Sequence, residues 1–436
     1  MAVLIKSRGY KINQQDGAGR TPLAWAARNG HEGVVKLLLE QENVDPNCSD
    51  KEDTTPLGLA AFIGNQGVVK LLLEQENVDP DRPDKYDLTP LGLAALNGHE
   101  GVVKLLLEHE NVDPNRRDNN NRTPLGGAAL NGHEEVVKLL LEIYNVDPNL
   151  PDNDNRTPLG LAAVNGHEGV VKLLLELENV DLDHPDKEYL TPLGLAALKG
   201  HERVVKLLLE CETVDPNRAD EYDRTPLGGA AFNGHQGVVK LLLEEENVHP
   251  NRPDKNNRTP LGWAALNGHE RVVKLLLECE TVDPNRAGEY DRTPLGGAAF
   301  NGHQGVVKLL LEHENVDPNR PDNNKRTPLG WAALKGHEGV VKSLLEHENI
   351  DPDRPDRNDL TPLAWATTKG HEGIVKLLLG QRDVDPNRLD NDGNTPLTYA
   401  AREKHEGIMQ LLQARKFIET LEAQLPAASP GVTQQR

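Results

Sequence analysis

A Thr-Pro pair returns every 34 residues through almost the whole chain. The pairs begin at residues 21, 55, 89, 123, 157, 191, 225, 259, 293, 327, 361 and 395, so eleven intervals of 34 follow one another without an insertion or deletion. A fixed period of this length indicates stacked structural units, each contacting mainly its neighbours. The 436 residues therefore predict one elongated repeat array rather than two or three globular domains.

Composition limits the partners and the compartment. The net charge of −21 argues against binding nucleic acid or an anionic membrane through a basic surface, and it favours a basic protein partner. The three cysteines, Cys48, Cys211 and Cys279, are sparse and odd in number, which fits a reducing compartment. The first residues contain too few consecutive apolar side chains for a signal peptide, and no stretch approaches the length of a membrane span. An intracellular, cytoplasmic location is therefore expected.

The copy from Thr89 to Arg122 shows what one unit encodes. Thr89 and Pro90 suit the cap and first position of a short helix, which Asn97-Gly98 ends. A second helix is expected from His99 to Glu108, with Val102, Val103, Leu105, Leu106 and Leu107 on its buried side. The Asp-Pro pair and the Asn and Asp residues after it predict a turn-rich, projecting finger. Each unit is thus expected to be helix, turn, helix, finger.

These residues resemble the ankyrin repeat. TPLGLAALNGHEGVVKLLLE is similar to that family's TPLHxAAxxGHxxVVxxLL signature, and the finger resembles its DxxGxTP segment. The resemblance covers residue 21 to about 412 and implies an all-α ankyrin solenoid of helix-turn-helix units with projecting hairpin or loop fingers. The His after TPL is Gly in nine copies, and the unit is 34 rather than 33 residues long. The finger glycine survives only as Gly19 and Gly393; Tyr189 and Lys325 suit its left-handed conformation poorly, so those two fingers are expected to be strained or rebuilt.

The repeat also sets expected boundaries. Residues 1–20 are interpreted as a partial N-terminal repeat, 21–394 as eleven ankyrin-like repeats, 395–425 as a C-terminal capping repeat and 426–436 as a flexible tail. The last second helix is expected to continue to about Leu425, with Phe417, Ile418 and Leu421 folding back. Because Val3-Leu4-Ile5 aligns with the leucines of a second helix, the chain is expected to begin inside a repeat, as a fragment of a longer protein would.

Chemistry-bearing patterns are weak. Histidine opens the second helix in eleven copies, but successive copies should lie about 10 Å apart, too far to share a metal ion. These histidines are interpreted as turn-stabilising residues. The chain has four serines and no nucleophile or phosphate-binding motif, so neither enzymatic activity nor a cofactor is expected.

Candidate partner-binding residues are the ones that the copies do not share. The residue two places before the glycine of each turn is expected on the inner, concave side, where the family's variable positions lie. These apolar-stripe residues are Phe62, Leu96, Leu130, Val164, Leu198, Phe232, Leu266, Phe300 and Leu334. They form either a groove for an extended or helical segment, or packing between adjacent first helices.

Two further sets vary among the copies. Finger tips supply a second group of candidates, namely Tyr86, Tyr222, Tyr290 and Arg357. Tryptophans 25, 263, 331 and 365 share one register, with Tyr399 last, and this register is expected inside the stack. Alternation with Gly229 and Gly297 predicts that the rings fill space left by neighbouring glycines. Asp at the base of each finger, absent only at Gly288, is expected to order the turn.

The expected function is a non-enzymatic scaffold that binds another protein or peptide through the concave face and the fingers. Two alternatives remain open. One is the ligand-recognition array of a larger receptor whose N-terminal signalling part is absent, and the other is an architectural spacer. The oligomeric state and the identity of the partner are not predicted.

Overall fold

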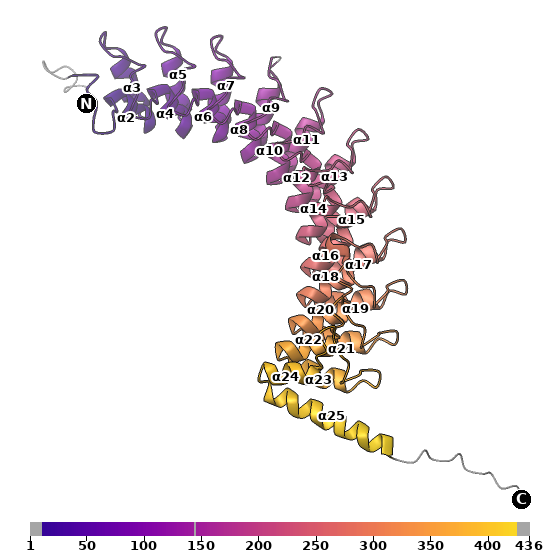
Figure 1. Cartoon of the computed structure of the whole chain (residues 1–436). Coiled ribbons are helices and arrows are strands. Elements are labelled where there is room, and N and C mark those ends of the chain that lie inside the picture. Colours follow the sequence, from indigo (N-terminus) through magenta and orange to yellow (C-terminus); the bar gives the residue numbers. More distant parts are fainter. Residues whose placement is uncertain (1–10, 144, 425–436) are drawn as a thin grey trace, which may run out of the picture. The chain divides into compact units, whose positions relative to one another are not determined.

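The computed structural model describes residues 11–143 and 145–424, which form helices and turns without a strand. The expectations for residues 1–10 and for the tail lie outside these residues. The chain divides into two compact units, Met1–Glu221 and Tyr222–Arg436. Within each unit, helix pairs repeat in tandem and each first helix contacts the first helices before and after it (Figure 1). The predicted all-α repeat architecture is confirmed.

In unit 1 the helices fall into two rows. The first helices are α2 (Pro22–Arg28), α4 (Pro56–Ile63), α6 (Pro90–Leu96), α8 (Pro124–Asn131), α10 (Pro158–Asn165) and α12 (Pro192–Lys199). The second helices are α3 (Glu32–Leu39), α5 (Gln66–Leu73), α7 (Glu100–Leu107), α9 (Glu134–Leu141), α11 (Glu168–Leu175) and α13 (Glu202–Leu209).

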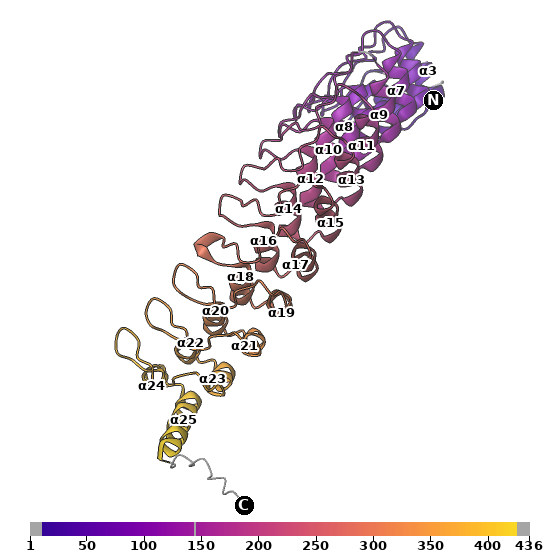
Figure 2. The same ribbon diagram turned by 90° about the vertical axis from the view of Figure 1, so that its right-hand side faces the viewer.

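Unit 2 repeats this pattern with two departures, described below. Its first helices are α14 (Pro226–Asn233), α16 (Pro260–Asn267), α18 (Pro294–Asn301), α20 (Pro328–Lys335), α22 (Pro362–Lys369) and α24 (Pro396–Arg402). Its second helices are α15 (Gln236–Leu243), α17 (Glu270–Leu277), α19 (Gln304–Leu311), α21 (Glu338–Leu345), α23 (Glu372–Leu379) and α25 (Glu406–Gln424). The fingers of this unit project beside the first helices, away from the second helices (Figure 2).

Each first helix begins with the cap that the Thr-Pro pair predicts. Thr89 Oγ accepts the backbone N–H of Gly92 at 3.1 Å, and Pro90 takes the first helical position, where no N–H is needed. Gly98 ends the turn with φ of +75°, a conformation that glycine adopts without strain.

The core consists of thin apolar layers between repeats. Leu91, the alanine pair 94–95, Val102, Val103 and Leu106 are almost completely buried, as are the residues at these positions in the repeats that begin at Thr55 to Thr361. Leu105 and Leu107 were predicted to be buried, but they are only half-buried. Helix α7 has only two turns, and its buried side holds three residues spaced for direct contact with α6.

Asparagine side chains join the connections that follow the second helices. Asn47 donates from Nδ2 to the carbonyl oxygen of Asn77 (2.6 Å), and its Oδ1 accepts the N–H of Asp79 (2.9 Å). The same pair of bonds is made by Asn13, Asn115, Asn149, Asn251, Asn285 and Asn319. The additional residue of the 34-residue unit therefore lies in a segment bonded from repeat to repeat.

Three copies carry aspartate at this asparagine position: Asp81, Asp183 and Asp353. In each of them the buried oxygen Oδ1 has no hydrogen-bond partner, because a carboxylate cannot donate to a carbonyl group. Burial raises the pKa of Asp81 and of Asp353 to about 6, although ion pairs with Arg116 and Arg388 oppose the shift. Burial raises the pKa of Asp183 as well.

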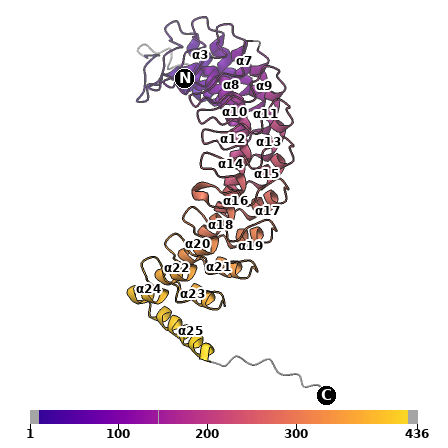
Figure 3. The same ribbon diagram turned by 45° about the vertical axis from the view of Figure 1, so that its right-hand side comes forward.

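Two departures occur in unit 2. One finger contains a short 3-10 helix, η1 (Glu289–Asp291), seen as a salmon ribbon among the loops in Figures 2 and 3. The other is α25, which has 19 residues where the other second helices have eight. The expectation that Phe417 and Ile418 fold back is wrong: they are 65% and 46% exposed, because α25 continues past the partner helices that would cover them. The expectation for Leu421 concerns a side chain outside the described part of the chain.

Candidate functional site

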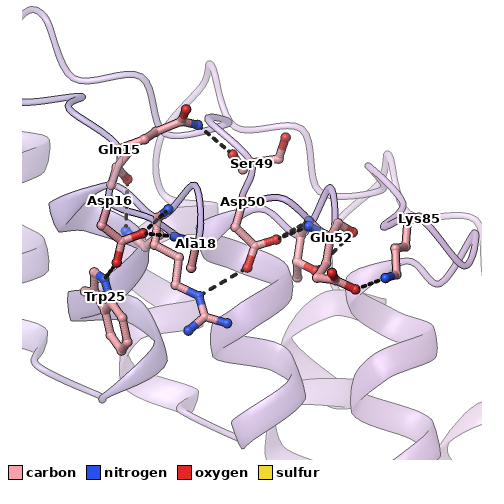
Figure 4. Close-up of polar contacts among 12 residues, drawn as sticks. Gln15, Asp16, Ala18, Trp25, Ser49, Asp50, Glu52 and Lys85 are labelled. Carbon is pink, nitrogen blue, oxygen red and sulfur yellow. Dashed lines mark hydrogen bonds and ion pairs between the residues drawn. The ribbon is translucent and has the colours of Figure 1, made fainter.

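The finger-base aspartates organise the face formed by the first helices and the fingers. Asp16 Oδ1 accepts the N–H groups of Ala18 (2.8 Å) and Arg20 (2.9 Å), which fixes the turn, as predicted (Figure 4). Its Oδ2 accepts the indole N–H of Trp25 at 2.8 Å. The backbone N–H of Arg20 and the indole N–H of Trp25 together lower the pKa of Asp16. The aspartates of the copies with a tryptophan thus use one oxygen for their own finger and the other for the indole N–H, as Asp254, Asp322 and Asp356 also show.

The tryptophan register lies against the finger base and is covered to different degrees. Trp331 is buried, with 8% of its surface exposed, Trp263 and Trp365 are half-buried, and Trp25 is 37% exposed. The rings of Trp263 and Trp331 pack edge-to-face on Phe232 and Phe300 respectively, each at a centroid distance of 4.9 Å. The prediction of a packed register therefore holds for these two copies.

The prediction that tryptophan rings fill the space beside glycines of this register fails at Gly297. A Cβ atom on Gly297 would lie 3.5 Å from Cδ1 of Leu266, and one on Gly127 would lie 3.5 Å from Cδ1 of Leu96. The space beside these glycines is thus taken by the stripe leucine of the preceding repeat. The expected filling by tryptophan is wrong for Gly297, because Trp263 and Trp331 pack on the preceding stripe phenylalanines, Phe232 and Phe300.

An arginine series on this face was missed by sequence reasoning. The Arg292 guanidinium lies 4.4 Å from the ring centroid of Phe300 and 4.6 Å from that of Trp331. Arg326 lies in the same way between Trp331 (4.3 Å) and Trp365 (4.6 Å). Burial lowers the pKa of Arg292. An arginine directly before Thr-Pro, with a tryptophan four residues after that threonine or at the same place in the next repeat, was the available signal.

The apolar stripe is neither fully core nor fully open. Phe62 is 46% exposed. The other eight residues, Leu96, Leu130, Val164, Leu198, Phe232, Leu266, Phe300 and Leu334, are half-buried. Each unit thus presents a row of apolar side chains, one per repeat, that contact the next repeat and still reach the surface.

The finger-tip candidates are exposed. Tyr86, Tyr222 and Tyr290 expose 50%, 52% and 56% of their surface, and Arg357 is exposed as well. Within a unit the fingers are joined by backbone bonds, such as Asn119 N–H to the Tyr86 carbonyl oxygen (3.0 Å). The exposed tips therefore rest on an ordered base.

The rebuilt finger is not one of the two that were expected. Tyr189 and Lys325 keep the left-handed conformation, with φ of 64° and 56°, in fingers of ordinary form. The finger that differs begins at Gly288, where the base aspartate is missing, and there Tyr290 and Asp291 both have positive φ. Loss of the organising carboxylate changes the finger more than an unfavourable residue in the left-handed position does.

The histidines link successive repeats. His133 Nε2 lies 3.0 Å from the carbonyl oxygen of Leu96, at the end of the preceding first helix, so this nitrogen carries the proton. A Cβ atom on Gly98 would lie 2.5 Å from Nδ1 of His133. The expected turn-stabilising role is thus directed at the turn of the preceding repeat. Asn65 replaces histidine and donates to the carbonyl oxygens of Ala27 and Arg28.

In the described part of the chain, neither the ligands of a metal site nor a membrane-spanning helix is found. Over residues 11–143 and 145–424, no group of three or more His, Cys, Asp or Glu side chains could hold a metal ion. No helix in those ranges has both the length and the apolar character needed to cross a membrane.

The helix pairs, capped turns and projecting fingers define a tandem-repeat protein whose units each consist of two helices joined by a turn. A family model described as "Ankyrin repeats (3 copies)" matches residues 1–84, 62–152, 128–220, 212–287, 282–356 and 351–420. The chain therefore belongs to the ankyrin repeat family, whose repeats are in general protein–protein interaction modules. A comparison with curated proteins gives no match.

Proposed function

We propose that this chain is a non-enzymatic scaffold that binds another protein or peptide through the face formed by its first helices and fingers. The observation that carries the proposal is the row of stripe side chains that stay accessible next to exposed tyrosines at the finger tips. Accessible apolar and tyrosine side chains on a rigid backbone are typical of interfaces. The net charge of −21 favours a partner with a basic surface, and an intracellular location remains part of the proposal.

A paired substitution tests the face. Phe232→Asp together with Phe300→Asp places two charges on the stripe of unit 2, and we expect loss of the bound partner in affinity capture from the native cell. Lys274→Asp with Lys308→Asp is the matched control, because both lysines are exposed on second helices of the same unit. Unchanged capture by a folded Phe232/Phe300 variant would refute binding through this stripe. Absence of any captured protein for the unmodified chain would favour the architectural spacer.

A further inference from the structure

Phenylalanine occupies three positions of the stripe, and at two of them a tryptophan of the next repeat covers the ring. Phe300 is covered by Trp331, whose indole N–H donates to Oδ2 of the finger-base Asp322 at 2.9 Å. Phe232 and Trp263 form the same arrangement with Asp254, again at 2.9 Å. The structure thus shows twice how this face binds an indole ring: phenylalanine contacts the ring, the aspartate accepts its N–H, and an arginine guanidinium stacks on the ring.

The third phenylalanine, Phe62, lacks this cover. The residue in the position of the tryptophan is Leu93, which has neither a ring nor an N–H donor, and the aspartate of the set is Asp84. A cavity of about 320 Å³ lies here, lined by Phe62, Leu93 and Asp84 among others. Its charged lining also includes Arg28, Glu52 and the ion pair of Arg20 with Asp50. The whole cavity belongs to unit 1, and Phe62 is the most exposed residue of the stripe.

Asp84 has an unused acceptor in this cavity. Its Oδ1 accepts the N–H groups of Tyr86 (2.8 Å) and Leu88 (3.0 Å), whereas its Oδ2 contacts no donor in residues 11–143 or 145–424. The ammonium group of Lys85, next to it in the chain, pairs with Glu52 (Figure 4). Burial raises the pKa of Asp84.

Neighbouring copies show which group is missing. Asp118 pairs with Arg122, directly before the Thr-Pro pair of its own finger, at 3.0 Å. Asp50 and Asp356 instead pair with the arginine in that position of the preceding repeat, Arg20 and Arg326. For Asp84 these two positions hold Leu88 and Thr54. Asp84 therefore has neither the arginine that pairs with Oδ2 of Asp50, Asp118 and Asp356 nor the tryptophan that donates to Oδ2 of Asp254 and Asp322.

We propose that this cavity binds a tryptophan side chain from a basic segment of the partner protein. The indole ring packs on Phe62 as Trp331 packs on Phe300, and its N–H donates to Oδ2 of Asp84. A positive charge beside the tryptophan supplies the cation that this carboxylate lacks. This inference rests on the proposed partner-binding function and specifies the chemistry of one contact.

The test uses a small probe, so it does not depend on knowing the partner. L-tryptophanamide carries an indole and one positive charge, and L-leucinamide is the matched control without the ring. We expect tryptophanamide to bind the unmodified protein more tightly than leucinamide, with NMR contacts to the ring of Phe62. Asp84→Asn replaces the free acceptor by a donor and should weaken binding about tenfold, whereas Asp152→Asn, at the same place in a finger whose Arg156 is present, should leave it unchanged.

A variant in which the chain's own side chain fills the cavity provides the decisive comparison. Leu93→Trp supplies the ring from the chain itself and should abolish tryptophanamide binding while the far-ultraviolet circular dichroism stays unchanged. Trp331→Leu uncovers Phe300 in unit 2 but leaves both arginine positions of that set filled, by Arg292 and Arg326, so it should add no second site of equal strength. Asp84→Asn keeps the test decisive if Leu93→Trp does not fold.

Two outcomes would overturn the inference: equal binding of the two amides, or unchanged tryptophanamide binding by a folded Leu93→Trp variant. Because the probe reports only on this cavity, its failure would leave the capture experiment on Phe232 and Phe300 unaffected.

Discussion

A single-atom difference separates the asparagine and aspartate copies of the connection. Asn115 satisfies a carbonyl oxygen and a backbone N–H of the next repeat with one amide group. Asp81 has an oxygen where the donating nitrogen would be, and this buried oxygen has no hydrogen-bond partner. A buried, unsatisfied polar group costs about 1–3 kcal/mol. These aspartates therefore weaken the array locally at neutral pH.

Asp81→Asn is expected to stabilise the protein at pH 7.5 by about 1–2 kcal/mol, because the amide can donate to the carbonyl group that the carboxylate cannot satisfy. The reciprocal change, Asn115→Asp, should destabilise it by a similar amount. Urea unfolding of both variants beside the unmodified protein measures the effect. An unchanged midpoint for Asn115→Asp would show that the amide bond contributes nothing.

The effect should depend on pH. Asp81 has a folded pKa of about 6 against a usual value of 3.8, so the folded protein takes up the proton first. Its stabilising contribution is therefore fully present below about pH 4, declines as the pH rises through 6, and is lost above that. The advantage of Asp81→Asn over the unmodified protein should accordingly shrink from pH 7.5 to pH 5. An advantage of equal size at both values would contradict the assignment.

At the scale of the element, the finger depends on one carboxylate at its base. The finger at 288–292 has glycine at that position and contains η1, with a left-handed Tyr290. A Cβ atom on Gly288 would lie 2.8 Å from Cγ of Arg258, whose guanidinium pairs with Glu289 and stacks on Trp263. The Arg258 side chain must therefore shift when a carboxylate is introduced at this position.

Gly288→Asp should restore the ordinary finger, because the new carboxylate can accept the N–H groups of Tyr290 and Arg292. We expect slower amide hydrogen exchange at these two residues and a gain in stability of about 1 kcal/mol. Asp152→Gly, which removes the same two bonds in unit 1, should speed exchange at Asp154 and Arg156. Unchanged exchange at Arg292 would disprove the role of the carboxylate.

Which element features could be predicted depends on where their partners lie in the chain. The Thr89 cap, the Gly98 turn and the finger-base aspartates act on residues one to four places away, so sequence spacing predicted them correctly. The acceptor of His133 and the two faces of Arg292 belong to adjacent repeats, and the period alone does not show which atoms meet there. The half-buried state of the stripe likewise depends on how far successive first helices overlap.

At the scale of the whole molecule, the 34-residue period makes a complete repeat removable. Deleting residues 123–156 joins Arg122 to Thr157 and places Leu96 next to the repeat of Leu161. In the unmodified chain that repeat already follows one with a stripe leucine, Leu130, so the new interface resembles the old one. We expect the shortened protein to fold, with an unchanged circular dichroism signal per residue, because stability in such arrays is a sum of repeats and nearest-neighbour interfaces.

Deleting 33 residues, 123–155, is the control for this prediction. It places an additional residue before the next Thr-Pro pair and disturbs one finger and its bonds to both neighbours. We expect a loss of stability of about 2 kcal/mol or more relative to the 34-residue deletion, measured by urea unfolding. Equal stability of the two shortened proteins would show that the exact period is not required by the structure.

The fit of the His133 ring over Gly98 has a consequence for how such a gene changes. At every such joint, the contact between a histidine and the turn of the preceding repeat, the histidine meets the same glycine and the same carbonyl acceptor, whichever copy precedes it. Unequal recombination between near-identical copies would therefore yield a chain whose joints are all still compatible, and the near match of residues 225–256 to 293–324 is the pattern expected of one such event. The number of repeats can thus vary over evolution more freely than the two residues that join them.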